Sequence, residues 1–204
     1  MNNSEIIQFL KDNIEPLKKE FEGNQYRCSA YLKDGTYLPC VIFQNPGPTV
    51  NQAIKRLKEE RTGKSIFAKI LRFDGYRDMV KLYTTSGNKV NEYDIARVEI
   101  SPFALPKHIL STIDGETTMS WTGFGVKMKD GKKFGFGTSF LFEFFQMPEG
   151  YEANNIDVIL NHQYMSTSGE LKEHNVPFTE WPSDYDEKAI YRECQYFKCY
   201  MEGI

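Results

Sequence analysis

The sequence predicts an α+β fold in which antiparallel sheets, made of hairpins and a meander, pack with an N-terminal helix and one or two further helices. Aromatic residues make up 14% of the 204 residues, and they favour half-buried strand positions. Two Lys-Asp-Gly turns, at 33–35 and 129–131, each stand between strand-like segments. Helical spacing of apolar residues is clearest near the N-terminus. We expect one domain over 1–204.

The N-terminal helix is expected over about residues 4–22, where apolar residues follow alternating steps of three and four. Ser4 is the expected N-cap, and Pro16 predicts a kink or break in the turn before it. A capping box begins a second helix, expected over 49–61. The stretch 190–201 fits both a helical stripe and a strand, and its aromatic content favours the strand.

The first Lys-Asp-Gly turn predicts a hairpin over 25–44. Counting outward from the turn places Cys28 opposite Cys40 on the apolar face, since side chains alternate along a strand. Two buried thiols acting as small hydrophobic residues are the favoured interpretation. A cross-strand disulfide or redox pair is the alternative.

The second turn predicts a hairpin over 118–145 with two unlike faces. One face carries phenylalanines and is expected to join the core, with Phe124 opposite Phe136. The other face is almost bare of side chains. It pairs Gly125 with Gly135, Gly123 with Gly137 and Trp121 with Ser139.

Glycine in a strand provides no packing, so four on one face require an explanation. The favoured one is a segment of the same chain packed closely on the glycines. The alternative is a shallow groove for a ligand ring or a partner's chain, with Trp121 and Ser139 at its rim.

A second candidate surface is the acidic stretch around Trp181, which contains Asp184, Asp186 and Glu187. A solvated loop is the simpler interpretation. Aromatic residues anchor protein interfaces and charge steers encounter, so the loop could instead grip a basic partner.

Several function classes are excluded by composition and motif. A net charge of −3 and a pI near 5.7 argue against nucleic-acid binding. No run reaches the roughly 18 apolar residues of a membrane span, and the N-terminal residues lack the basic and apolar regions of a signal peptide, so we expect a cytoplasmic protein. The four cysteines show no metal-ligand spacing, and no nucleotide motif is present, so no metal or cofactor is expected.

The leading hypothesis is a small cytoplasmic, non-catalytic protein-binding module, comparable to an immunity-type inhibitor or an adaptor subunit, with another protein, preferably a basic one, as its partner. The alternative is a small-molecule-binding protein or a hydrolase beside the glycine face, using His162, Glu143 and Ser139. The hydrolase requires His162 and a carboxylate within hydrogen-bond reach in one pocket.

Overall fold

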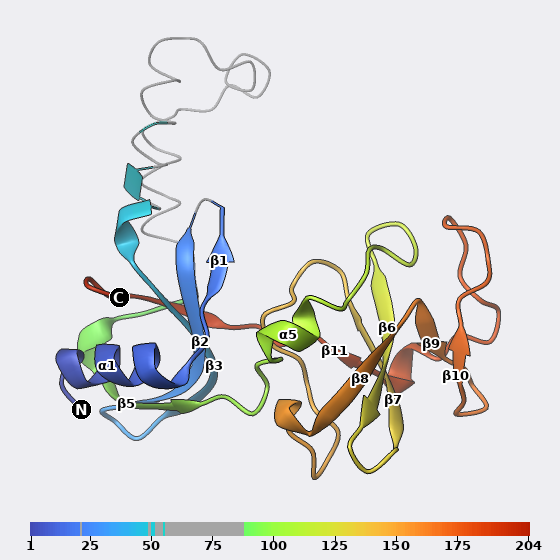
Figure 1. Cartoon of the computed structure of the whole chain (residues 1–204), viewed down its shortest axis with the longest axis horizontal. Helices are drawn as coiled ribbons and strands as arrows, with labels where there is room; N and C mark the ends of the chain where they lie inside the picture. Colours follow the sequence, from blue (N-terminus) through green and yellow to red (C-terminus); the bar gives the residue numbers. More distant parts are fainter. Residues whose placement is uncertain (21, 49, 52–54, 56–87) are drawn as a thin grey trace. The chain divides into compact units, whose positions relative to one another are not determined.

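A computed structural model describes residues 1–20, 22–48, 50–51, 55 and 88–204 (Figure 1). The chain divides into two compact units, and each contains a sheet of its own. Unit 1 consists of Met1–Tyr26, Ala30–Val98 and Phe197–Ile204, and unit 2 consists of Arg27–Ser29 and Glu99–Tyr196. The domain predicted from the sequence spans 1–204 and includes both units. The fold is α+β with mostly antiparallel pairing, as the sequence predicts.

The N-terminal helix α1 spans Asn3–Asn13 and begins with a capping box. The Asn2 side chain accepts a hydrogen bond from the Glu5 amide (2.9 Å), and the Glu5 carboxylate accepts one from the Asn2 amide (2.8 Å). The expected N-cap, Ser4, is therefore wrong by two positions. Only Asn2 has a glutamate three residues onward, so only Asn2 can complete the reciprocal pair.

The predicted extent of this helix, to residue 22, is also wrong, because strand β1 occupies Leu17–Lys19. The expected break before Pro16 is confirmed, since α1 ends at Asn13. The pyrrolidine ring would clash with the carbonyl four residues earlier, and the residue before a proline is disfavoured from helical conformation. The chain beyond the proline pairs with β2 (Gly23–Leu32) instead of continuing the helix.

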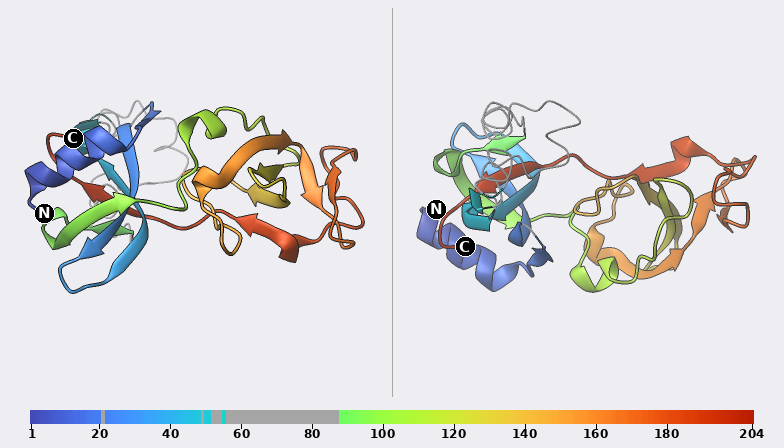
Figure 2. Two further views of the ribbon diagram at one scale, coloured as in Figure 1. Left: turned by 60° about the horizontal axis from the view of Figure 1, so that its bottom comes forward. Right: turned by 90° about the horizontal axis from the view of Figure 1, so that it is seen from above.

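The unit 1 sheet has the strand order β1-β2-β3-β12-β4, and β5 pairs with β2 outside this path. Helix α1 lies along this sheet and buries Ile6 and Leu10 completely (Figures 1 and 2). Strand β12 is parallel to both of its neighbours. The remaining elements are β2 (Gly23–Leu32), β3 (Tyr37–Gln44), β4 (Lys89–Val90), η1 (Glu92–Asp94), β5 (Ile95–Ile100) and β12 (Phe197–Tyr200).

The hairpin predicted over 25–44 is confirmed as β2 and β3. Leu32 donates its amide hydrogen to the Thr36 carbonyl at 2.8 Å, and Gly35 takes a φ of +90° in the turn. Cys28 and Cys40 are buried and are not joined by a disulfide. The helix predicted over 49–61 lies outside the described residues apart from 50, 51 and 55.

The unit 2 sheet has the order β11-β7-β6-β8, and a separate two-stranded hairpin, β9–β10, follows β8. Strand β11 joins the sheet parallel to β7, and its existence with β12 confirms strand structure in 190–201. The elements are α5 (Lys107–Leu110), β6 (Thr122–Met128), β7 (Lys133–Thr138), η2 (Ala153–Asn155), β8 (Ile156–Asn161), β9 (Gln163–Met165), β10 (Leu171–Glu173), η3 (Glu187–Ala189) and β11 (Ile190–Arg192). Across the described part of the chain, no helix has the length and apolarity that a bilayer crossing requires.

The predicted register of the second hairpin is confirmed from Lys127↔Lys133 to Thr122↔Thr138. Its predicted extent over 118–145 is wrong at the open end, because β7 stops at Thr138. The Thr138 hydroxyl bonds both the carbonyl (2.7 Å) and the amide (3.0 Å) of Leu141, which closes a local turn in place of the ladder.

The phenylalanine face of the hairpin joins the core, as predicted. Phe124 and Phe136 are fully buried and stack with ring centroids 5.8 Å apart. The cluster around them consists of Leu105, Ile109, Val126, Met128, Phe145, Ala153 and Ile156. The opposite face of the same two strands therefore remains for the glycines.

Candidate functional site

The glycine face is covered by other parts of unit 2. A Cβ atom added at any of the four glycines would lie closer than 3.0 Å to a covering atom, which real side chains essentially never do. The close-packing interpretation is therefore confirmed, and the glycines do not form an open groove. The clashing partners are Trp121 (2.1 Å) at Gly137, Leu171 (2.4 Å) at Gly125, Ile190 (2.8 Å) at Gly135 and the Gln163 carbonyl (2.9 Å) at Gly123.

The indole of Trp121 lies directly on Gly137, and only 7% of this residue is exposed. A tight turn places it there. The Trp121 amide donates to the Thr118 carbonyl at 2.9 Å, and Ser120 takes a left-handed φ of 60°. The indole can pack this close to the β7 backbone only because Gly137 has no side chain.

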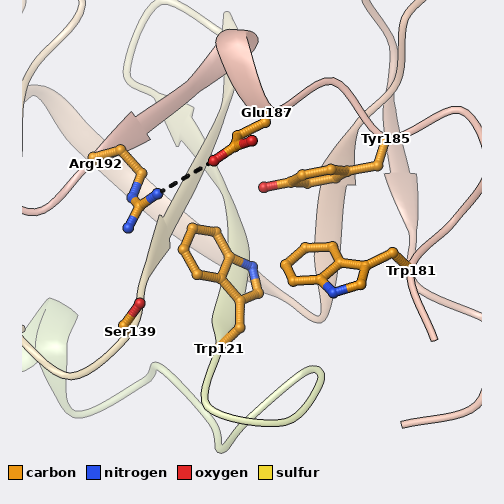
Figure 3. Close-up of a pocket in the computed structure, with 6 residues that line it drawn as sticks. All are labelled: Trp121, Ser139, Trp181, Tyr185, Glu187 and Arg192. Atoms are coloured by element: carbon orange, nitrogen blue, oxygen red, sulfur yellow. Dashed lines mark ion pairs between the residues drawn. The ribbon is translucent and has the colours of Figure 1, made fainter. Parts of the chain in front are cut away.

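Beside this ring is a surface pocket of about 420 Å³ (Figure 3). Four of its lining residues were predicted, two as the rim of the glycine face and two as part of the acidic stretch. The structure brings these two surfaces together, although neither was expected to meet the other. The lining residues are Trp121, Ser139, Trp181, Tyr185, Glu187 and Arg192.

Three aromatic rings form one side of the pocket. The ring centroids of Trp121 and Trp181 are 5.7 Å apart with planes at 55°, and those of Trp181 and Tyr185 are 4.7 Å apart at 49°. Trp181 is 48% exposed, so its ring is open to an incoming group. Burial, aided by the charge of Glu187, raises the pKa of Tyr185 from 10.0 to about 12.

No family model, curated protein or solved structure matches this chain. The functional conclusion therefore depends on the residues of the pocket themselves.

The other side of the pocket carries charged groups. The Arg192 guanidinium lies 4.5 Å from the centre of the Trp121 ring, so that Trp121 stands between Arg192 and Trp181 (Figure 3). Two nitrogens of Arg192 bond the two carboxylate oxygens of Glu193 at 3.0 and 3.2 Å. Glu187 is more distant, 3.9 Å from Arg192, and its side chain is 77% exposed. Glu193 is thus the main partner of the guanidinium.

The other two acidic residues of the predicted surface have structural partners. Asp184 accepts hydrogen bonds from the Tyr164 hydroxyl (2.7 Å) and the Lys172 ammonium (2.8 Å), which ties the stretch after Trp181 to the β9–β10 hairpin. Asp186 caps η3 by accepting a hydrogen bond from the Lys188 amide (3.0 Å). Of the three predicted acidic residues, only Glu187 lines the pocket.

The residues of the hydrolase alternative are not gathered in this pocket. Ser139 lines it, but His162 and Glu143 do not. His162 lies between β8 and β9 with a φ of 52°, and its Nε2 is 3.9 Å from an Asp114 carboxylate oxygen. Glu143 is 5% exposed. Among the described residues, no group of three or more His, Cys, Asp or Glu side chains could hold a metal ion.

Arg192 and Tyr185 line the pocket but were not predicted as site residues. Arg192 pairs with Gly137 across the parallel β11–β7 ladder, two positions after Ile190, which pairs with Gly135. Strand alternation puts both side chains on the glycine face. That alternation was readable in the sequence, but the pairing of β11 with β7 was not.

Proposed function

We propose that the chain is a cytoplasmic, non-catalytic protein-binding module that acts as an inhibitor or an adaptor subunit. We propose further that it contacts its partner through the surface of unit 2 around the pocket. The observation that carries the proposal is the exposure of large apolar side chains around the pocket. Met119 is 65% exposed, Phe140 71%, and Phe178 and Trp181 48% each. Contiguous exposed apolar surface marks interaction sites in soluble proteins.

These side chains belong to the segments that form the pocket. Phe140 follows Ser139 directly, and Met119 precedes Trp121 by two positions. The Met119 amide donates to the Phe178 carbonyl at 3.2 Å, so the segments before Trp121 and before Trp181 lie side by side. Exposed apolar residues therefore occur in the same chain segments as the aromatic rings of the pocket.

The extent of this surface favours a protein over a small molecule as the ligand. A volume of about 420 Å³ would suit a small ligand, which favours the small-molecule alternative. Such a ligand would leave the apolar side chains of the rim in water, whereas a protein would cover them. Aromatic residues and methionine are also the types enriched in the centres of protein interfaces.

The charge of the surface favours a basic partner. The Glu187 carboxylate is largely exposed at the pocket, Glu180 is exposed next to Trp181, and the whole chain carries a net charge of −3. Complementary charge speeds encounter and excludes acidic competitors.

The test is affinity capture from a lysate of the source organism, comparing wild type with Trp181→Ala. The matched control is Tyr93→Ala, which removes an aromatic side chain that is 67% exposed in unit 1. We expect wild type and Tyr93→Ala to retain one basic protein in stoichiometric amount, and Trp181→Ala to lose it. Equal capture by Trp181→Ala, or loss with Tyr93→Ala alone, would refute the proposed surface.

A further inference from the structure

The charged groups at the pocket do not balance. Arg192 contributes one positive charge, and the bidentate bonds from Glu193 neutralise it. Glu187 adds a second carboxylate, 3.9 Å from the guanidinium and 77% exposed. The pocket thus holds one negative charge more than its own cation compensates.

The same pocket already holds one cation against an aromatic ring. The guanidinium of Arg192 lies 4.5 Å from the Trp121 ring centre, within the range in which the negative face of an aromatic ring attracts a cation. Indole is the most favourable aromatic group for this interaction. The interior end of the ring cluster is therefore occupied by a residue of the chain.

The outer end of the cluster offers the same chemistry, because indole and phenol rings both attract cations to their faces. Trp181 is 48% exposed and lies 4.7 Å from Tyr185, while Glu187 lines the pocket beside them (Figure 3). The phenol of Tyr185 is neutral at pH 7, because the ordinary pKa of a tyrosine is about 10. Two neutral ring faces and an exposed carboxylate thus converge on one space.

We infer that this space receives one lysine or arginine side chain of the partner, with the cation against Trp181 and Tyr185 and paired with Glu187. The inference rests on the proposed function and specifies the chemistry of its contact. The negative face of an aromatic ring attracts a cation but not a neutral alkyl group, so a charged group is favoured over an apolar one of the same size.

The experiment uses fluorescence, because the chain has two tryptophans and both line the pocket. The probes are N-acetyl-lysine methylamide with its norleucine counterpart, and N-acetyl-arginine methylamide with its citrulline counterpart, at low ionic strength. Norleucine keeps the four-carbon chain of lysine without its ammonium group, and citrulline replaces the guanidinium of arginine with a neutral urea of the same size. We expect a saturable change in tryptophan emission with both cations, and at least tenfold weaker binding of both neutral probes.

Two carboxylate variants separate the pocket charge from the overall charge. Glu187→Gln should raise the Kd of the lysine probe about tenfold, while Glu149→Gln, an exposed carboxylate of unit 2 outside the pocket, should leave it unchanged. Both variants should keep the wild-type circular dichroism spectrum. Trp181→Ala should abolish binding of the lysine probe as read from Trp121 emission, and if this variant fails to fold the Glu187→Gln result decides.

The possible failures can be told apart. Equal binding of norleucine and lysine, or an unchanged Kd in Glu187→Gln, overturns the cation inference, while partner capture that still depends on Trp181 would leave the proposed function standing. Lysine binding that depends on Glu187, together with partner capture indifferent to Trp181, supports the cation site and overturns the docking surface instead.

Discussion

Gly137→Ala is the sharpest test of how the aromatic pocket is built. The added Cβ would lie 2.1 Å from Cζ2 of Trp121, and 2.7 and 2.8 Å from Cη2 and Cε2. Carbon atoms normally meet at about 3.5 Å, so the indole or the β7 backbone must move by roughly 1.4 Å. The ring cannot retreat freely, because it is 7% exposed and carries Arg192 on its face.

The net cost of Gly137→Ala should be about 2 kcal/mol. Overpacking a filled core costs about 1–3 kcal/mol, and a rigid indole meeting the Cβ with three ring atoms belongs at the upper end, about 3 kcal/mol. Alanine is favoured over glycine in a strand by about 0.5–1 kcal/mol, which offsets part of this cost.

The assay is urea unfolding followed by tryptophan emission, which reports unit 2 because both tryptophans belong to it. A double-mutant cycle with Trp121→Ala isolates the clash, and Trp181 remains as the fluorophore. Without the indole, Gly137→Ala should be neutral or slightly stabilising. Gly125→Ala is the matched control, since its Cβ would meet the flexible end of Leu171, and it should cost about 1 kcal/mol.

Two results would refute this reasoning. One is a cost below about 0.5 kcal/mol for Gly137→Ala in the wild-type background. The other is an equal cost in the presence and absence of Trp121, which would place the strain elsewhere in β7.

Three further predictions concern titratable groups. The hydrogen bond from Lys172 holds the pKa of Asp184 below its ordinary value of 3.8. This carboxylate therefore stabilises the fold above about pH 4, and the contribution is lost as the pH falls through the lowered pKa. In Asp184→Asn, the urea concentration at the unfolding midpoint should fall less steeply at acid pH than in wild type. Burial raises the pKa of Tyr185 from 10.0 to about 12, so its stabilising contribution is complete below pH 10 and is lost between pH 10 and 12. Between these pH values the urea midpoint of Tyr185→Phe should change less than that of wild type. Burial also raises the pKa of the Cys199 thiol to about 12. At pH 8 the half-buried Cys194 should therefore react with Ellman's reagent first, and Cys199 only after unfolding. Rapid labelling of Cys199 in the folded chain would contradict this.

Local signals predicted the hairpins and the register of the second one, but not where its strands end. Turn chemistry and alternation set the register from Lys127↔Lys133 to Thr122↔Thr138 without knowledge of the rest of the chain. The strand then ends because Thr138 bonds Leu141, which is a choice among local hydrogen bonds that alternation does not encode.

Four of the six residues that line the candidate site were predicted from the sequence, but their assembly into one pocket was not. Trp121 and Ser139 were identified from the hairpin register, and Trp181 and Glu187 from aromatic and acidic composition. They meet because β11 enters the sheet parallel to β7, which puts Arg192 opposite Gly137. Parallel strands more than fifty residues apart are not joined by a short turn, so no local sequence signal predicts their pairing.

The position of β12 has a consequence for the order in which the chain can fold. Strand β12 lies between β3 and β4, yet about 150 residues separate it from β3 along the chain. Closing so long a loop costs entropy before any contact compensates for it, which slows folding. All strands of the unit 2 sheet precede residue 197. During synthesis that sheet can therefore form before β12 is made, whereas the unit 1 sheet cannot be completed until then.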